Sequence, residues 1–480
     1  DRLELNLYSI NEYRRGGNKF ELEPHQTDIT EELDHNILGA GLSYEHFSKN
    51  LRHKLAAYAS LQSIQRNSYY GGGGSRVLEP GDSLTEADIL AINAYGKSND
   101  LSAIGGLLYT YVFSDEMNIS LGSEAQFNTV KDQMPGYNRQ ILQEVITIGN
   151  FAQLEWSPLK DLTLLAGVRY DLINIQGDYS FDNEDFNNNR DFGILAPRIS
   201  AMYEINDYLK LRASYAQGYR APQAFNEDLH IETVGGAARF VQLDPNLKTE
   251  YSDNYNLSIN YTRSFSKTQV NFLVEGFHTV LSNAFIFSDP VELSQGVSVI
   301  TKRNSSGTAV QGVNLEANMA FGSNLTIQSG ATIQSAKYQE TETIWESEDQ
   351  SNERSPVRTD EVLRTPQVYG YFTLKYRAFK KLDIAYSGVI TGPMKVPHVV
   401  EPATEYTIIE KTPGFFENTI KLNYEIELKG NFHLELFAGI QNIFNAYQND
   451  FDLGAQRDAG YVYGPARPRT LFSGLKFCFN

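Results

Sequence analysis

The chain has 480 residues, and its 59 acidic residues outnumber its 41 basic residues, which gives a net charge of −18. This charge argues against non-specific binding to nucleic acid, which needs a basic face. No run of about 18 or more apolar residues occurs, so no transmembrane helix is expected. Cys478 is the single cysteine, which excludes an internal disulfide framework, and we assign it no redox role.

Alternation of apolar and polar residues recurs from one end of the chain to the other. The opening "DRLELNLYSI" already alternates and does not resemble a signal peptide, so we expect the chain to begin inside a fold. Further alternating segments follow in chain order at 117–127, 162–170, 209–215, 255–261, 372–376 and 432–440, and in the closing "LFSGLKFCFN". Helical periodicity is nearly absent. Alternation with one polar face predicts strands of an antiparallel sheet.

Short polar turns alternate with long connections along the chain. We expect long segments near 12–26, 69–97, 130–140, 176–193, 220–249, 285–295, 339–363, 396–411 and 446–467. The run 296–321 is interpreted as one strand with a kink near "RNSSG". About eighteen strands result, and an even number places both ends of the chain on the side of the tight turns. Compact soluble domains seldom hold so many long loops, whereas outer-membrane barrels combine short periplasmic turns with long extracellular loops.

We therefore predict an all-β fold, an antiparallel transmembrane β-barrel that occupies residues 1–480. Outward Leu and Phe side chains would face lipid, and inward polar side chains would face a wet lumen. The last strand is expected to pair with the first, because a barrel has no free edges. A soluble protein with several β-sheets would also show alternation, but the strand number, strand length and loop asymmetry together favour the barrel.

Several segments resemble those of TonB-dependent outer-membrane receptors. "YRAPQAFNEDLH" (219–230) and "LDPNLKTEYSDNYNLSINY" (243–261) resemble the FRAP and NPNL boxes of that family. Further similar segments are "YRRGG" (13–17), "GVNLEANM" (312–319), "GIQNIFNAYQNDF" (439–451) and "GYVYGPARPRTLFSGLKF" (460–477). The closest likeness is to receptors of Bacteroidetes-type bacteria for chelated iron, haem or cobalamin. The chain is short for the larger glycan importers.

The resemblance implies a 22-stranded barrel that holds an N-terminal plug preceded by a TonB box. Neither plug nor box is found in this sequence, and about four strands of the implied barrel are missing, so either an N-terminal part is absent from it or the chain is a divergent barrel. The implied function is import of a ferric siderophore, haem or cobalamin across the outer membrane with energy from TonB–ExbB–ExbD. The implied surroundings are the lipid bilayer and lipopolysaccharide, with a surface lipoprotein as a further partner. Two alternatives stay open, a passive porin-like channel and a structural barrel in a larger outer-membrane complex.

One group of candidate residues lies at the end of the FRAP-like segment. Pro222 is expected to end strand pairing because it lacks an N–H. Arg220 would pair with plug or wall carboxylates such as Glu227 and Asp228, or would contact ligand directly. His230 lies between the two boxes, where haem receptors of the family carry an iron-ligating histidine, and its alternative is an ordinary polar loop residue. Other histidines near long loops that could supply a second ligand are His25, His35 and His398.

Aromatic and basic residues near the long loops form a second group. Tyr69 and Tyr70 precede a glycine run in "SYYGGGGS" and could stack on a planar ligand or sit in an aromatic girdle, and the same choice applies to Tyr461 and Tyr463. Arg14 and Arg15 could attract an anionic siderophore or pair with loop acids.

Neither a metal site nor catalytic chemistry is expected. "FDNEDFNNNRDFG" (181–193) lacks the ligand spacing of an EF-hand and is interpreted as a solvated turn. No nucleophile motif, zinc spacing or phosphate loop stands out, so we expect neither enzymatic activity nor a cofactor.

Overall fold

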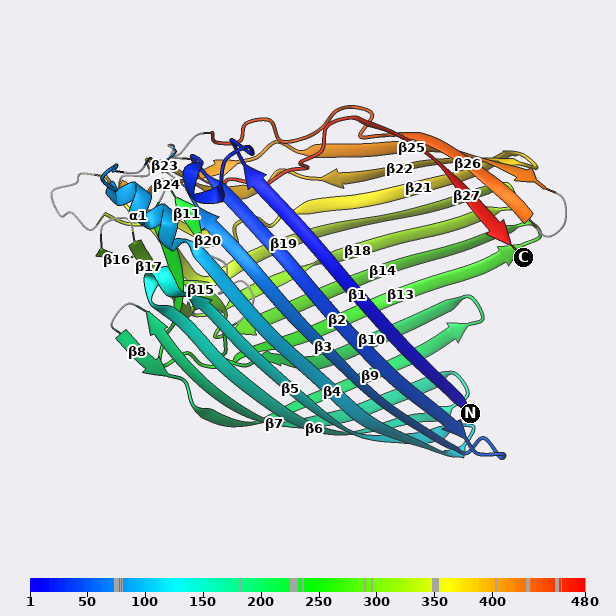
Figure 1. The fold of residues 1–480 in the computed structure, drawn as a ribbon. Coiled ribbons are helices and arrows are strands. Elements are labelled where there is room, and N and C mark those ends of the chain that lie inside the picture. The colour runs from blue at the N-terminus through cyan, green and yellow to red at the C-terminus, as the bar shows by residue number, and fades with distance from the viewer. Residues whose placement is uncertain are drawn as a thin grey trace.

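A computed structural model describes residues 1–479 except 73–76, 78, 80, 182–183, 225–231, 235–236, 289–290, 295–296, 348–353, 402–403, 429–431, 454–456 and 459. These described residues form one large antiparallel sheet, a small second sheet and a separate hairpin (Figure 1). Among them, no helix has the length and apolar character needed to cross a membrane.

The large sheet has 20 strands in the described residues, and two of them, β8 (Glu184–Asn187) and β20 (Val357–Glu361), are only 4 and 5 residues long. Eighteen long strands remain, which confirms the predicted number. In chain order they are β1 (Arg2–Gly17), β2 (Thr30–Phe47), β3 (His53–Gly71), β4 (Tyr95–Ser114), β5 (Met117–Met134), β6 (Arg139–Leu159), β7 (Leu162–Phe181), β9 (Arg190–Asn206), β10 (Leu209–Arg220), β13 (Glu250–Phe265), β14 (Thr268–Ser282), β18 (Thr308–Phe321), β19 (Leu325–Trp345), β21 (Val368–Phe379), β22 (Leu382–Thr391), β25 (Phe415–Glu427), β26 (Phe432–Gln441) and β27 (Thr470–Phe479).

The remaining elements all lie in the connections between long strands. They are η1 (Pro24–Gln26), α1 (Glu86–Asn93), η2 (Pro135–Tyr137), β11 (Glu232–Val234), β12 (Ala237–Leu243), β15 (Phe285–Phe287), β16 (Val291–Ser294), β17 (Val297–Asn304), β23 (Lys395–Glu401) and β24 (Tyr406–Lys411). Strands β11, β12, β15, β16 and β17 form the small second sheet, and β23 pairs with β24.

The prediction of a single strand over 296–321 is wrong. The segment divides into β17 and β18, and β17 pairs with β12, β15 and β16 and not with a strand of the large sheet. Gly307, between the two strands, has a φ of +125°, a conformation that favours glycine and turns the chain. β18 alternates, whereas β17 alternates only over Val297–Val299 and buries all four residues of Val297–Ile300, so the period of β18 does not extend through the whole segment.

The two ends of the large sheet differ as the alternation of connection lengths predicts (Figure 1). Tight turns such as 115–116, 160–161 and 207–208 gather at one end, here called the turn end, and both chain termini lie there. Helix α1, the small sheet and the β23–β24 hairpin lie at the opposite end, here called the loop end.

The two faces of the sheet differ in polarity, as strand alternation requires. On β13 the outward Tyr255, Leu257 and Ile259 are 50%, 56% and 46% exposed. The inward residues of the same strand are Asn254, Asn256, Ser258 and Asn260. Elsewhere on the inner face, Arg169 bridges strands through ion pairs with Glu124 (Nη2–Oε1 3.0 Å) and Asp171 (Nε–Oδ1 2.8 Å). The sheet therefore has an apolar outside and a polar inside.

The expected pairing of the last strand with the first does not occur. In the described residues β1 pairs with β2 and β27 pairs with β26, and no pairing joins β1 to β27. Leu3, Leu5 and Leu7 on β1 are 65–70% exposed. The eighteen strands therefore curve into an open sheet with two free edges, which agrees with a chain that holds part of a larger barrel.

Substituting Leu257 tests the orientation of the faces. In lipid vesicles, Leu257→Arg is expected to lower the free energy of unfolding by about 2–4 kcal/mol, because it puts a charge near the middle of β13 on the face that is predicted to contact lipid. Asn256→Arg, one residue away on the inner face, is the control and is expected to have a much smaller effect. Denaturant titration followed by tryptophan fluorescence measures both, and equal destabilisation would contradict the assignment of the faces.

Candidate binding site at the loop end

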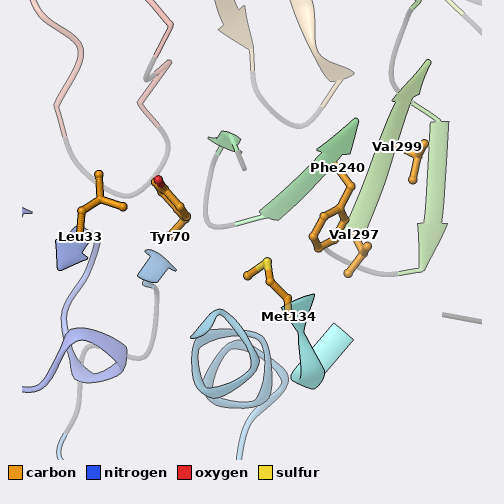
Figure 2. Packing of buried hydrophobic residues seen from close by; sticks show 6 residues of the cluster. All are labelled: Leu33, Tyr70, Met134, Phe240, Val297 and Val299. Carbon is orange, nitrogen blue, oxygen red and sulfur yellow. The ribbon is translucent and has the colours of Figure 1, made fainter. Parts of the chain in front are cut away.

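The small sheet packs against the inner face of the large sheet at the loop end. Its strands β12 and β17 run parallel to each other, from Ala238 opposite Val297 to Leu243 opposite Lys302. Figure 2 shows the buried cluster that joins the two sheets. Its members are Leu33 of β2, Tyr70 of β3, Met134 of β5, Phe240 of β12, and Val297 and Val299 of β17. The described parts of the connections 221–249 and 283–307, with β12 and β17, thus pack inward against the large sheet at this end.

A second cluster fixes the start of the connection after β10. Ala224, Leu243 and Leu247 pack against Ile141 of β6 and Tyr179 of β7. The side chain of the buried Gln143 holds Ala224 at both backbone groups. Its Nε2 donates to the Ala224 carbonyl (3.1 Å), and its Oε1 accepts from the Ala224 N–H (2.8 Å) and from the Tyr179 hydroxyl (2.7 Å).

The FRAP-like residues lie at this anchored turn. Arg220 is the last residue of β10, lies opposite Glu250 of β13, and its guanidinium is 5.6 Å from the ring centroid of Phe285. Pro222 is buried just beyond the strand, and its carbonyl accepts a hydrogen bond from Asn188 Nδ2 at 2.9 Å. Glu227, Asp228 and His230 lie outside the described residues, so their expected roles stay predictions.

The two neighbouring tyrosines of β3 occupy opposite faces. Tyr70 points inward into the cluster of Figure 2. Tyr69 is 1% exposed, its hydroxyl donates to the Ala91 carbonyl of α1 (3.0 Å), and its ring lies 4.7 Å from that of Tyr95. Both side chains hold the loop end together in this structure, and a ligand-binding role for them stays a prediction.

Arg14 and Arg15 also lie on opposite faces at the end of β1. Arg15 donates to the Leu22 carbonyl (2.6 Å) and lies 3.6 Å from the Glu32 carboxylate. The side chain of Arg14 is opposite the inward Leu33, is 57% exposed, and forms an ion pair with Glu12 at 3.4 Å. Arg15 therefore stabilises the 18–29 connection, whereas Arg14 keeps a largely exposed guanidinium on the inner face.

His398 joins the β23–β24 hairpin to the last connection through two carboxylates. Its Nδ1 lies 3.0 Å from Glu410 Oε1, and its Nε2 lies 3.1 Å from Asp452 Oδ2. The ring of Tyr461 stacks on the imidazole at 3.7 Å with 12° between the planes, and its hydroxyl donates to Glu410 Oε2 (2.7 Å). Because both ring nitrogens face a carboxylate, the imidazolium with two N–H donors fits this arrangement.

The charges of this network shift the pKa values of its members. Burial by itself lowers the pKa of His398, but hydrogen bonds to Glu410 and Asp452 outweigh burial and raise the pKa above its ordinary value. The same contact with His398, together with the Tyr461 hydroxyl, lowers the pKa of Glu410. Burial first and then the Glu410 carboxylate raise the pKa of Tyr461.

Gln448 organises the segment between β26 and β27 that carries Tyr461 and Tyr463. Its buried amide donates to the Tyr461 carbonyl (3.0 Å) and accepts from the N–H groups of Tyr463 (2.8 Å) and Gly464 (3.2 Å). The Tyr463 hydroxyl donates to Asp450 at 2.5 Å, and burial followed by this carboxylate raises the pKa of Tyr463 to about 12. The predicted contact of either tyrosine with a ligand stays untested.

Sequence reasoning missed three features of the loop end. Helix α1 begins after Thr85 with a capping box, in which the Thr85 hydroxyl accepts from the Asp88 N–H and the Asp88 carboxylate accepts from the Thr85 N–H. That threonine–aspartate spacing was a usable signal. The small sheet and the Gln143 contacts had no local signal, because they depend on residues that are far apart in sequence. His398 was considered as a second ligand, but both of its nitrogens already have carboxylate partners.

Comparison with known proteins agrees with the geometry. The sequence model of a family described as "TonB dependent receptor-like, beta-barrel" matches residues 3–443. No curated protein sequence matches the chain.

Similar solved structures include the FrpB iron transporter of Neisseria meningitidis, with a TM-score of 0.66 and 13% identity over 98% of this chain and 69% of that one. The ferric-catecholate import receptor Fiu of E. coli K12 has a TM-score of 0.62 and 12% identity over 94% and 65%. The siderophore receptor PirA of Acinetobacter baumannii has a TM-score of 0.60 and 13% identity over 93% and 67%. The chain spans about two thirds of the length of these proteins.

Replacing Gln143 tests the anchor of the connection after β10. Gln143→Ala leaves both backbone groups of the buried Ala224 without their hydrogen-bond partners. The free energy of local opening of 221–224 is therefore expected to fall by about 1–3 kcal/mol. Hydrogen exchange of the Ala224 amide measures this change. Gln140→Ala removes a glutamine of the same strand that bonds to Gln133 instead, and serves as the control. Unchanged protection of Ala224 in the Gln143 variant would show that the packed cluster alone holds the turn.

The raised pKa of His398 predicts that this network weakens as the pH rises. An unfolded histidine has a pKa near about 6.5, so the stabilisation is fully present below that value and is lost as pH rises through the higher folded pKa. Exchange of the Val399 amide, which donates to Asp458 Oδ2 at 2.8 Å, is therefore expected to accelerate with pH beyond its intrinsic rate. His398→Gln should remove this extra pH dependence, whereas His25→Gln, at the same end, should keep it. Identical pH profiles for His398→Gln and the unsubstituted protein would disprove the role of His398.

Proposed function

Because the chain belongs to the family of TonB-dependent receptor β-barrels, we propose that it forms the barrel of an outer-membrane receptor that imports a scarce chelated nutrient. The observation that carries the proposal is the family match over residues 3–443, in a chain whose eighteen long strands have turns at one end and elaborated connections at the other. A ferric siderophore is the first candidate for the cargo, because similar structures include an iron transporter and siderophore receptors. Haem and cobalamin are the other two candidates.

The loop end is the proposed binding face. In this orientation the loop end faces the exterior, the turn end faces the periplasm, and the apolar outer face contacts lipid and lipopolysaccharide. Arg14 is the described candidate residue best placed to meet an anionic ferric chelate, since its side chain is 57% exposed on the inner face. Tyr463 is a second candidate residue because it offers an aromatic ring, although its hydroxyl donates a hydrogen bond to Asp450.

The rest of the receptor is proposed to close the sheet and to couple it to energy. The free edges of β1 and β27 would pair with further strands of the same protein, because unpaired backbone groups are costly in a bilayer. A plug preceded by a TonB box would fill the interior and connect to TonB–ExbB–ExbD. A surface lipoprotein would be a further partner at the loop end.

Uptake by the full-length protein tests this proposal. Expressed in a strain that lacks its own siderophore receptors, the protein is expected to support accumulation of radiolabelled iron from at least one ferric siderophore, and to lose it when TonB is deleted. Haem and labelled cobalamin are tested in parallel.

Arg14→Ala is expected to raise severalfold the concentration of an anionic chelate that gives half-maximal uptake. Arg2→Ala, at the turn end, is the control. Uptake that persists without TonB would indicate a passive channel, and stable protein partners without any uptake would indicate a structural barrel.

A further inference from the structure

The last two strands bring three different metal-binding side chains together at the turn end. In the register of β26 and β27, His433 lies directly opposite Cys478, and Glu435 lies opposite Lys476. His433, Glu435 and Cys478 share one face of this pair of strands, because alternate residues of a strand point the same way. The apolar Leu434, opposite Phe477, occupies the other face. The three side chains therefore lie on the polar inner face.

The donor atoms of these side chains are close enough to approach one ion. The imidazole nitrogen, carboxylate oxygen and sulfur all lie within 4.8 Å of one another, and the Cys478 Sγ is 4.0 Å from Glu435 Oε1. Zinc–ligand distances of about 2.0–2.3 Å place neighbouring ligand atoms roughly 3.6 Å apart in a tetrahedral site. Small side-chain rotations of half-buried residues would close this difference.

We propose that His433, Glu435 and Cys478 bind a divalent cation of the zinc class. A thiolate together with an imidazole favours zinc, and the ions chemically close to it, over magnesium or calcium, which prefer oxygen ligands. Three protein ligands leave a fourth tetrahedral position for water. Binding displaces the thiol proton to solvent, because the thiolate is the ligand.

The surroundings of the site hold several positive charges. Lys375, Arg377 and Lys421 line the same hollow as Glu435, and Arg377 forms an ion pair with Asp383. Lys476 Nζ lies 3.6 Å from Glu435 Oε1, but its side chain is 61% exposed and can turn away into solvent. Once bound, the ion would tie β26 to β27 beside the free edge of the large sheet. It would fasten β27, which has one partner among the described pairings, to its neighbour β26.

Cobalt(II) is the probe for this site, because a cobalt–thiolate bond gives a near-ultraviolet charge-transfer band that a cysteine hydrogen bond does not. The folded full-length protein in detergent is titrated with Co²⁺, and Zn²⁺ is then added to displace it. We expect a saturable band at one ion per chain that Zn²⁺ abolishes. Cys478→Ser should remove the band, and His433→Ala should weaken Co²⁺ binding at least tenfold. Folding of each variant is checked by its heat-dependent migration in a detergent gel.

A matched histidine provides the control. His46 also lies near the turn end of a long strand, and its Nδ1 is 2.6 Å from Asp1 Oδ1, but it has no cysteine beside it in the described residues. His46→Ala should leave the band and the affinity unchanged. Absence of the band in the folded protein, or equal affinity in His433→Ala and the unsubstituted protein, would overturn the proposal and leave the Cys478–Glu435 contact as a hydrogen bond. Neither readout involves transport, so this proposal can fail independently of the import function.

Discussion

A transmembrane sheet has no water along its outer face, so every strand within the bilayer needs backbone partners on both sides. The long strands from β2 to β26 meet this requirement through an uninterrupted series of antiparallel neighbours. The two outermost strands, β1 and β27, have one partner each among the described pairings. The same requirement therefore explains both the regularity of the large sheet and the need for a partner at its two edges.

The loop end obeys a different constraint. Its connections carry their own apolar residues, which find burial by folding inward against β2, β3, β5, β6 and β7. Backbone groups that are buried there form hydrogen bonds with single side chains, as Gln143 bonds to the backbone of Ala224 and Gln448 to that of Tyr461. The result is a partly covered interior, in which hydrogen bonds of single side chains hold the described parts of the connections in place.

The long strands of the large sheet could be predicted from the sequence, because the alternation of apolar and polar residues is visible within a single strand. Asn254–Tyr261 alternates perfectly, and the structure places its asparagines inside and its tyrosine, leucine and isoleucine residues outside. The site was harder to predict because its contacts join distant segments. Tyr69 and Tyr70 are adjacent in sequence and chemically identical, yet one supports α1 and the other packs against the small sheet. His398 has no local motif, and its partners Glu410 and Asp452 come from two different connections.

The central claim is that these eighteen strands are one part of a plugged, TonB-coupled receptor. The most direct measurement is the intact mass and N-terminal sequence of the mature protein purified from outer membranes. The account predicts further residues before Asp1 that include a plug domain and a TonB box. A mature protein that begins at Asp1 would contradict it, because such a chain has neither a partner for its free edges nor a route to TonB.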